Sequence, residues 1–305
     1  LTEEGHAVLY HPVYRLAFSI YANSLASQQI DKLVVAANKA QVDSCTYTSP
    51  HIVLIIGESF SKHHSQQYGY AQPNTPRQIR RERSGQLVKF NDVVSPWNLT
   101  SYVFKHVFSL YDVGEQGEWC DYPLFPELFR KAGYHVTFIT NQFLPKAKEA
   151  VYDFSGGFFL NNPTLIKAMF DTRNDSIYRY DEHLVGQYAR LKAQAGKHNL
   201  TIFHLMGQHL FYKERFPENR QRWNDTDYKS LRPDLTSRQR RILADYDNAV
   251  LYNDSVVDLI VKQFESEDAI VIYMPDHGEE CYEERRGIVC RNHSAAIDYP
   301  LAKYE

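Results

Sequence analysis

Four short runs of apolar residues recur along the chain after residue 50, and polar or charged residues follow most of them. The runs cover residues 51–56, 136–140, 200–205 and 269–274. Uninterrupted apolar runs of this length are typical of strands buried on both faces of a parallel sheet. Stretches with helical character lie between them, at 126–132, 176–195 and 237–265. This alternation predicts an α/β fold, a three-layer α/β/α sandwich with a mostly parallel central sheet.

The first 48 residues follow a different pattern. Apolar side chains between Tyr10 and Ala40 have mixed helical spacing among glutamine, asparagine and serine residues. The stretch predicts one or two helices, either an ordinary N-terminal arm or a connector beside a membrane. We therefore expect a helical segment at 1–48 and one α/β domain at 49–305. Because the chain begins at Leu1 without a methionine, we also expect a segment to precede it.

Composition narrows the possible functions. The 305 residues include 34 Lys and Arg against 37 Asp and Glu, a net charge of −3, which argues against nucleic acid as a partner. A hydrophobic content of 43% excludes disorder and is enough for a sizeable core. Of the four cysteines, Cys281 and Cys290 flank a polar loop. Spacing alone leaves a disulfide between them and two separate thiols as equal alternatives.

Ionisable side chains follow three of the predicted strands. Glu58 follows the first, His204 and His209 lie around the end of the third, and Asp276 and His277 follow the fourth. Parallel strands deliver such residues to a common crevice, so we expect these groups to converge. Taken singly, Glu58 suits a helix-cap neighbour and His204 a core histidine. Together, carboxylates and imidazoles are the ligand set of a catalytic Zn²⁺, so the sequence predicts a metal site.

Candidate nucleophiles lie between the first and second strands, in the segment 93–102. A hydroxyl that ligates Zn²⁺ loses its proton near neutral pH and can attack phosphorus without a histidine base. Thr100 and Ser101 precede a predicted helix at 102–110, whose first backbone N–H groups can bind a phosphate. A simple capping role is the structural alternative for Thr100. The chemistry alone leaves Thr100, Ser101 and Ser95 open.

Short motifs accompany these residues from about residue 50 to the C-terminus. They are Gly57-Glu58-Ser59, Tyr68-Gly69-Tyr70 with Asn74-Thr75-Pro76, His204 to His209 with Tyr212 and Arg215-Phe216-Pro217, Tyr246 to Asp254, and Pro275 to Glu280. As a set they resemble the phosphoethanolamine transferases of the alkaline phosphatase superfamily, in particular those that modify the lipopolysaccharide core. The resemblance implies an alkaline-phosphatase-like catalytic domain at 49–305.

Carried over residue by residue, the resemblance implies roles for the strand-end residues. Zinc would be held by Glu58, Thr100, Asp276 and His277, and Thr100 would be the nucleophile that becomes covalently modified. The implied reaction transfers phosphoethanolamine from phosphatidylethanolamine to a lipopolysaccharide or other glycolipid acceptor. The resemblance also implies N-terminal transmembrane helices in the bacterial inner membrane and a catalytic domain in the periplasm, a compartment that suits a disulfide.

The resemblance assigns the histidines differently. His209 and His293 match positions that bind a second zinc ion or the transferred phosphate group, whereas His204 matches a structural position. His293 follows His277 by 16 residues in a loop without a firm motif.

The sequence also departs from the family in two places. Many members have a Cys-Gly-Thr sequence around the nucleophile, whereas this chain has Leu99-Thr100-Ser101. The assignment of Thr100 therefore rests on order and spacing, and Ser101 remains an alternative. A further strand is expected beyond Tyr299, so we expect the C-terminal end at Glu305 to be truncated or disordered.

Three other functions are compatible with the same fold. A sulfatase needs a Cys or Ser in a C/S-x-P-x-R segment, and Ser95-Pro96-Trp97 has the wrong spacing and no arginine. A glycerophosphate transferase or phosphodiesterase would share the metal site and differ in the head group. A catalytically inactive domain that binds lipid or glycan is the alternative from another class.

Overall fold

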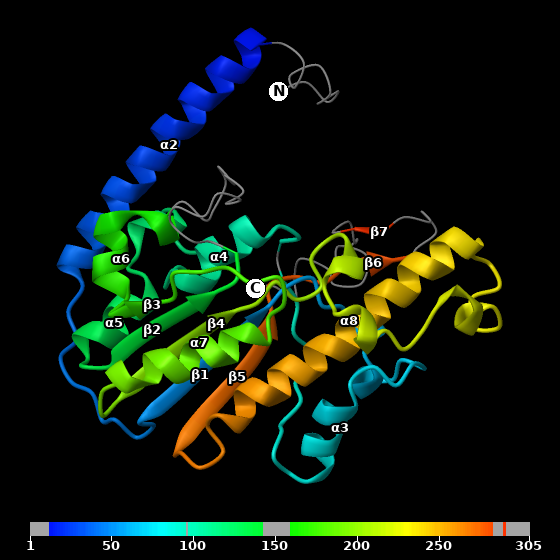
Figure 1. Cartoon of the computed structure of the whole chain (residues 1–305). Coiled ribbons are helices and arrows are strands. Elements are labelled where there is room, and N and C mark those ends of the chain that lie inside the picture. Colours follow the sequence, from blue (N-terminus) through cyan, green and yellow to red (C-terminus); the bar gives the residue numbers. More distant parts are fainter. Residues whose placement is uncertain (1–11, 96, 143–158, 283–288, 291–305) are drawn as a thin grey trace.

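A five-stranded parallel sheet forms the centre of the protein (Figure 1). The computed structural model describes residues 12–95, 97–142, 159–282 and 289–290. The sheet has the order β3-β2-β4-β1-β5, and every neighbouring pair is parallel. Its strands are β1 (His51–Gly57), β2 (His135–Thr140), β3 (Thr172–Arg173), β4 (Asn199–His204) and β5 (Ala269–Pro275). All four apolar runs form strands of this sheet, which confirms the predicted parallel core.

Helices cover both faces of the sheet and give the predicted three layers (Figure 1). Side chains of successive strand residues point to opposite faces, so each face has its own hydrophobic core. Phe138 belongs to the core under one face, and Ile139 to the core under the other. The first core includes residues of α4 (Thr100–Phe108), α5 (Phe125–Lys131) and α6 (Pro163–Met169), and the second includes residues of α7 (His183–Leu191) and α8 (Ser237–Lys262).

The N-terminal segment forms one helix, α2 (Pro12–Lys39), where the sequence predicted one or two. Leu33 near its end is buried in the first core, whereas Leu16 and Ile20 nearer its start are exposed. The first part projects from the body of the protein (Figure 1). Among the described helices, none is both long and apolar enough to cross a bilayer. The division at residue 48 stays a prediction, as does the expected C-terminal end, which lies outside the described residues.

The helix predicted at 176–195 is shorter than expected. It begins only at His183, and residues before it form a loop. The reason lies in Asp181, whose buried carboxylate accepts hydrogen bonds from the backbone N–H groups of Met206 and Gly207, both at 2.9 Å. The loop therefore reaches the carboxyl edge of the sheet and holds the segment that follows β4. No periodicity of apolar residues reports a contact of this kind.

Two buried aspartates of α8 hold the segment that follows β1. Asp247 accepts hydrogen bonds from the Tyr70 hydroxyl at 2.8 Å and from the Asn74 amide at 3.1 Å. Asp254 accepts the backbone N–H groups of Arg77 and Gln78, both at 3.0 Å, at the start of α3 (Pro76–Arg83). The motif around Asn74 and the motif along α8 therefore contact each other through these hydrogen bonds.

The two cysteines that flank the polar loop lie on adjacent strands. β6 (Glu280–Cys281) pairs antiparallel with β7 (Val289–Cys290), and Cys281 lies opposite Val289. The side chain of Cys290 lies outside the described residues, so the disulfide stays a prediction.

We expect Asp254→Ala to lower the free energy of unfolding by about 3 kcal/mol, because it leaves the buried N–H group of Gln78 and the partly buried one of Arg77 without an acceptor. Asp254→Asn keeps one acceptor oxygen and should cost about half as much. Arg77→Ala removes only an ion pair of 3.4 Å and should change stability by less than about 1 kcal/mol. Urea unfolding followed by circular dichroism measures all three. Equal losses for Asp254→Ala and Arg77→Ala would contradict this account.

Candidate active site

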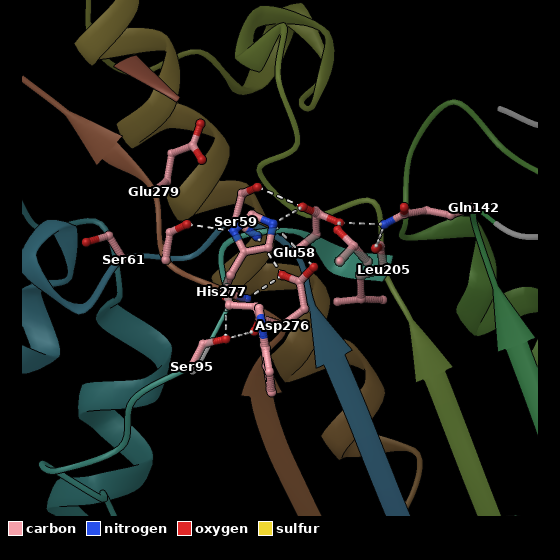
Figure 2. A network of polar contacts seen from close by, with 12 residues as sticks. Glu58, Ser59, Ser61, Ser95, Gln142, Leu205, Asp276, His277 and Glu279 are labelled. Atoms are coloured by element: carbon pink, nitrogen blue, oxygen red, sulfur yellow. Dashed lines mark hydrogen bonds and ion pairs between the residues drawn. The ribbon is translucent and has the colours of Figure 1, made fainter. Parts of the chain in front are cut away.

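Three ionisable side chains meet where β1 and β5 end (Figure 2). Glu58 follows β1, and Asp276 and His277 follow β5; the strands pair in register, with Gly57 opposite Pro275. One ligand atom from each of the three side chains lies within 4.8 Å of the others, and all three residues are buried. The structure thus brings together three of the four residues proposed from the resemblance as zinc ligands through adjacent strand ends. We call this group the metal cluster.

Burial and mutual charge perturb the metal cluster strongly. Burial and the nearby Glu58 carboxylate together raise the pKa of Asp276 to about 7. Burial opposes a charged imidazole, but the carboxylates of Asp276 and Glu58 outweigh it and raise the pKa of His277 to about 9. Both raised pKa values arise because two buried carboxylates lie side by side and are stabilised by a positive charge next to them. A divalent cation would supply that charge and take the place of the imidazole proton.

The orientation of each side chain fits a metal ion. The Nδ1 atom of His277 lies 2.7 Å from the Gly278 carbonyl oxygen, to which it donates, so Nε2 is the nitrogen that would face a metal ion. Nε2 lies 3.1 Å from Glu58 Oε1 and 3.5 Å from Asp276 Oδ2. Backbone N–H groups of Ser59 and His277 donate to the other oxygen, Asp276 Oδ1. Two carboxylates and one imidazole with inward-facing atoms are a donor set that zinc accepts.

Thr100 lies against the metal cluster. Its hydroxyl donates to Glu58 Oε2 at 3.0 Å, and the residue is buried in the first turn of α4. Ser101 is also buried in that turn, whereas the hydroxyl of Ser95 donates to the backbone oxygens of Trp97 and Asp276. Of the three hydroxyls considered from the sequence, Thr100 has the contact expected of a nucleophile. Its role, like the ligand assignments, stays a prediction.

Sequence reasoning missed two residues that contact Glu58. The hydroxyl of Ser59 donates to Glu58 Oε1 at 2.7 Å, and Ser59 itself adopts a left-handed conformation with a φ of 55°. Gln142 follows β2, and its Nε2 donates to Glu58 Oε2 at 3.2 Å and to the Leu205 carbonyl at 2.7 Å (Figure 2). The signal for Gln142 was available, because it follows a predicted strand at the same edge of the sheet.

The structure describes two of the three histidines to which the resemblance assigns roles. His204 is fully buried; its Nδ1 lies 3.0 Å from the Thr140 hydroxyl, and its ring contacts that of Phe104. Burial lowers the pKa of His204 to about 3, so it is a neutral core histidine. His209 ends the turn after β4 and is half-buried. It is not part of the metal cluster, and His293 lies outside the described residues.

The turn that carries His209 packs directly on the backbone of Glu58. Gly207 has a φ of +48°, and a Cβ atom there would lie 2.8 Å from the Glu58 backbone N and O atoms. The Gln208 N–H donates to the Glu58 carbonyl at 3.0 Å. Only glycine allows this approach, which fixes the position of His209 relative to the strand end that carries Glu58.

The sequence profile of the sulfatase family matches residues 50–303. The chain belongs to the sulfatase family. Its curated relatives include the phosphoethanolamine transferases EptC of Escherichia coli and EptA of Helicobacter pylori, both 29% identical over 236 and 251 residues. The matches cover 76% and 79% of this chain but 40% and 44% of those proteins. This sulfatase-family chain thus spans less than half the length of those curated relatives.

Solved structures share the fold of this sulfatase-family domain. The C-terminal periplasmic domain of Escherichia coli EptC matches with a TM-score of 0.71 and 26% identity, over 83% of this chain and 72% of that one. The same domain in complex with zinc matches with a TM-score of 0.69 and 25% identity, over 83% and 72% of the two chains. An alkaline phosphatase superfamily protein from Vibrio parahaemolyticus matches at 0.50 with 18% identity, over 83% and 63%. The predicted alkaline-phosphatase-like fold is confirmed.

We expect Gln142→Leu to weaken zinc binding by this sulfatase-family domain about tenfold to a hundredfold, because Glu58 loses a hydrogen bond that orients it. Competition with a chromophoric chelator measures the affinity. The matched control is Gln187→Leu, which removes a buried amide of α7. Equal affinities for Gln142→Leu and the unmodified protein would exclude the orienting role.

Proposed function

We propose that this sulfatase-family domain transfers phosphoethanolamine from phosphatidylethanolamine to a lipopolysaccharide-type glycolipid through a covalent intermediate on Thr100. The observation that carries the proposal is the hydroxyl of Thr100, hydrogen-bonded to Glu58 within a buried cluster of metal-ligand type. The relatives named phosphoethanolamine transferases support the head group. A zinc complex of a related domain supports the metal.

Glu58, Asp276, His277 and Thr100 would hold the zinc ion. When bound, zinc lowers the pKa of a coordinated hydroxyl and offsets negative charge on phosphoryl oxygens. Glu58 Oε2 accepts the hydrogen bond of the Thr100 hydroxyl, so the proton has a defined acceptor while Thr100 is neutral. Because Thr100 is the first residue of α4, the start of this helix would present backbone N–H groups to a phosphate bound at Thr100.

The reaction has two displacements on phosphorus. First, the Thr100 oxygen bonds to phosphorus, the bond from phosphorus to the glycerol oxygen breaks, and diacylglycerol leaves with a proton. Then an oxygen of the acceptor attacks phosphorus, and the Thr100 oxygen is released and regains a proton. His209, fixed by the turn after β4, would contact the transferred phosphate group or hold a second zinc ion. We assign His293 the same role on the resemblance alone.

Two other functions on this fold have weaker support. A sulfatase requires the C/S-x-P-x-R motif, and the segment that leads to Thr100 does not contain it. A transferase or phosphodiesterase for glycerophosphate shares the site and differs only in the head group, so a comparison of ethanolamine and glycerol donors decides between them. A purely binding domain has no need of a buried Thr100 against three ligand-type side chains.

We also propose that the domain works in the periplasm, tethered to the inner membrane by a segment outside this sequence. Support comes from the related Escherichia coli domain, which is described as periplasmic, and from relatives more than twice as long as this match. The projecting helix α2 would then be the link between membrane and domain.

We expect the zinc-loaded protein to gain the mass of one phosphoethanolamine group when incubated with phosphatidylethanolamine. Thr100→Ala should abolish the adduct, because the attacking oxygen is lost, whereas Ser101→Ala should retain it. Removal of zinc by a chelator should lower the rate of adduct formation by at least about a hundredfold. Intact-protein mass spectrometry measures the adduct, and peptide fragmentation locates it.

An adduct that survives in Thr100→Ala and disappears in Ser101→Ala would move the nucleophile to Ser101 and keep the function. No adduct on the unmodified protein, with zinc bound, would overturn the transferase proposal. An adduct formed with phosphatidylglycerol alone would assign the glycerophosphate alternative.

A further inference from the structure

A cleft of about 650 Å³ opens beside the metal cluster, and apolar side chains form most of its wall. Asp276, His277 and Ser95 line this cleft, and Figure 2 shows how their side chains lie. The wall comes from the segments at and after the ends of β1 and β5, from the segment between α3 and α4, from α4 itself and from the residues after α4. This cleft has no role in the proposed chemistry described so far.

Several apolar side chains that line the cleft are exposed to solvent. Phe90, Val93 and Val113 line it and are 70%, 65% and 56% exposed, respectively. Val103 and Val107 of α4 line the same cleft. Single exposed apolar residues are ordinary, but several that share one cleft mark a binding surface. Its volume also falls within the range of roughly 300–1,000 Å³ that is typical of small-molecule sites.

We propose that this cleft binds the glycerol backbone and the first part of the acyl chains of the glycerolipid donor. The inference rests on the proposed function and names where its substrate lies. A phosphorus atom at the metal cluster carries two parts, the ethanolamine and the diacylglycerol. Because the cleft is lined by Asp276 and His277 and its wall is mostly apolar, it matches the diacylglycerol part.

The composition of the wall selects this occupant over others. Polar side chains such as Lys62, Asn91 and Asp112 also line the cleft, but apolar atoms form most of its wall. This favours acyl chains over a sugar acceptor, which requires hydrogen-bonding groups along its length. The ethanolamine ammonium is small and polar, and apolar side chains would only desolvate it. Binding energy from acyl chains remote from phosphorus would help to orient the bond that breaks, so it should appear in kcat/KM for the donor.

The sequence offers a matched pair of valines for the test. Val93 lines the cleft, whereas Val88 lies in the same segment, is 79% exposed and does not line it. Because Phe90, Val93 and Val88 are all exposed, their replacement by serine should leave folding intact. The rate of adduct formation on Thr100 is measured with two donors, dihexanoyl-phosphatidylethanolamine below its micellar concentration and glycerophosphoethanolamine, which lacks acyl chains.

We expect Phe90→Ser with Val93→Ser to lower kcat/KM for the dihexanoyl donor about tenfold, as for lost apolar contacts in a pocket. The same variant should leave the rate with glycerophosphoethanolamine and the zinc affinity within about twofold of the unmodified protein. Val88→Ser should change none of these quantities. If glycerophosphoethanolamine reacts too slowly to measure, zinc affinity serves as the reference, since the changed side chains are not ligands.

Two outcomes would overturn the inference separately from the function. If the unmodified protein forms the adduct but Phe90→Ser with Val93→Ser reacts with dihexanoyl-phosphatidylethanolamine as fast as Val88→Ser does, the cleft does not bind the acyl chains. If both donors slow equally, the substitutions act on the metal cluster and the cleft assignment is wrong. If the unmodified protein forms no adduct with either donor, the proposed function fails and the inference fails with it.

Discussion

Two carboxylates and one imidazole, all buried and in mutual contact, impose the constraint on which the rest of the structure depends. Charges of this kind are costly inside a protein unless a cation and hydrogen bonds compensate them. The raised pKa of Asp276 shows this cost, whereas the raised pKa of His277 shows how strongly the two carboxylates favour a positive charge beside them. The parallel pairing of β1 with β5 holds Glu58 against both of them. The left-handed backbone at Ser59 is explained by the two hydrogen bonds it gives to Glu58 and Asp276.

The loops around this cluster are held by buried aspartates that accept backbone N–H groups. Asp181 holds the turn after β4, and Asp254 holds the start of α3. Asp247 does the same through the side chains of Tyr70 and Asn74. A carboxylate with several donors fixes a loop more rigidly than apolar packing does, because each bond is directional. Asp181, Asp247 and Asp254 thus hold loops in place, whereas Glu58 and Asp276 belong to the metal cluster.

In these proposals, the metal cluster and the apolar cleft bind two different parts of the same donor lipid. The cluster suits a phosphoryl group, and the cleft suits the part of a lipid that leaves when phosphorus changes partner. The segment between α3 and α4 serves both, because it supplies Phe90 and Val93 to the cleft and leads directly to Thr100. Attachment of both functions to one segment would keep the breaking bond in line with the attacking hydroxyl.

The sequence alone determined the parallel sheet, the three layers and the strand ends that carry Glu58, Asp276 and His277, because buried parallel strands leave a pattern of neighbouring residues. It did not determine the choice among Thr100, Ser101 and Ser95, nor did it single out Gln142 as a partner of Glu58. Thr100 lies 42 residues from Glu58, and Gln142 lies 84 residues from it. Contacts over such separations depend on how helices and turns pack across the sheet. Only the tertiary structure, through that packing, brought the hydroxyl of Thr100 and the amide of Gln142 to the same oxygen of Glu58, Oε2.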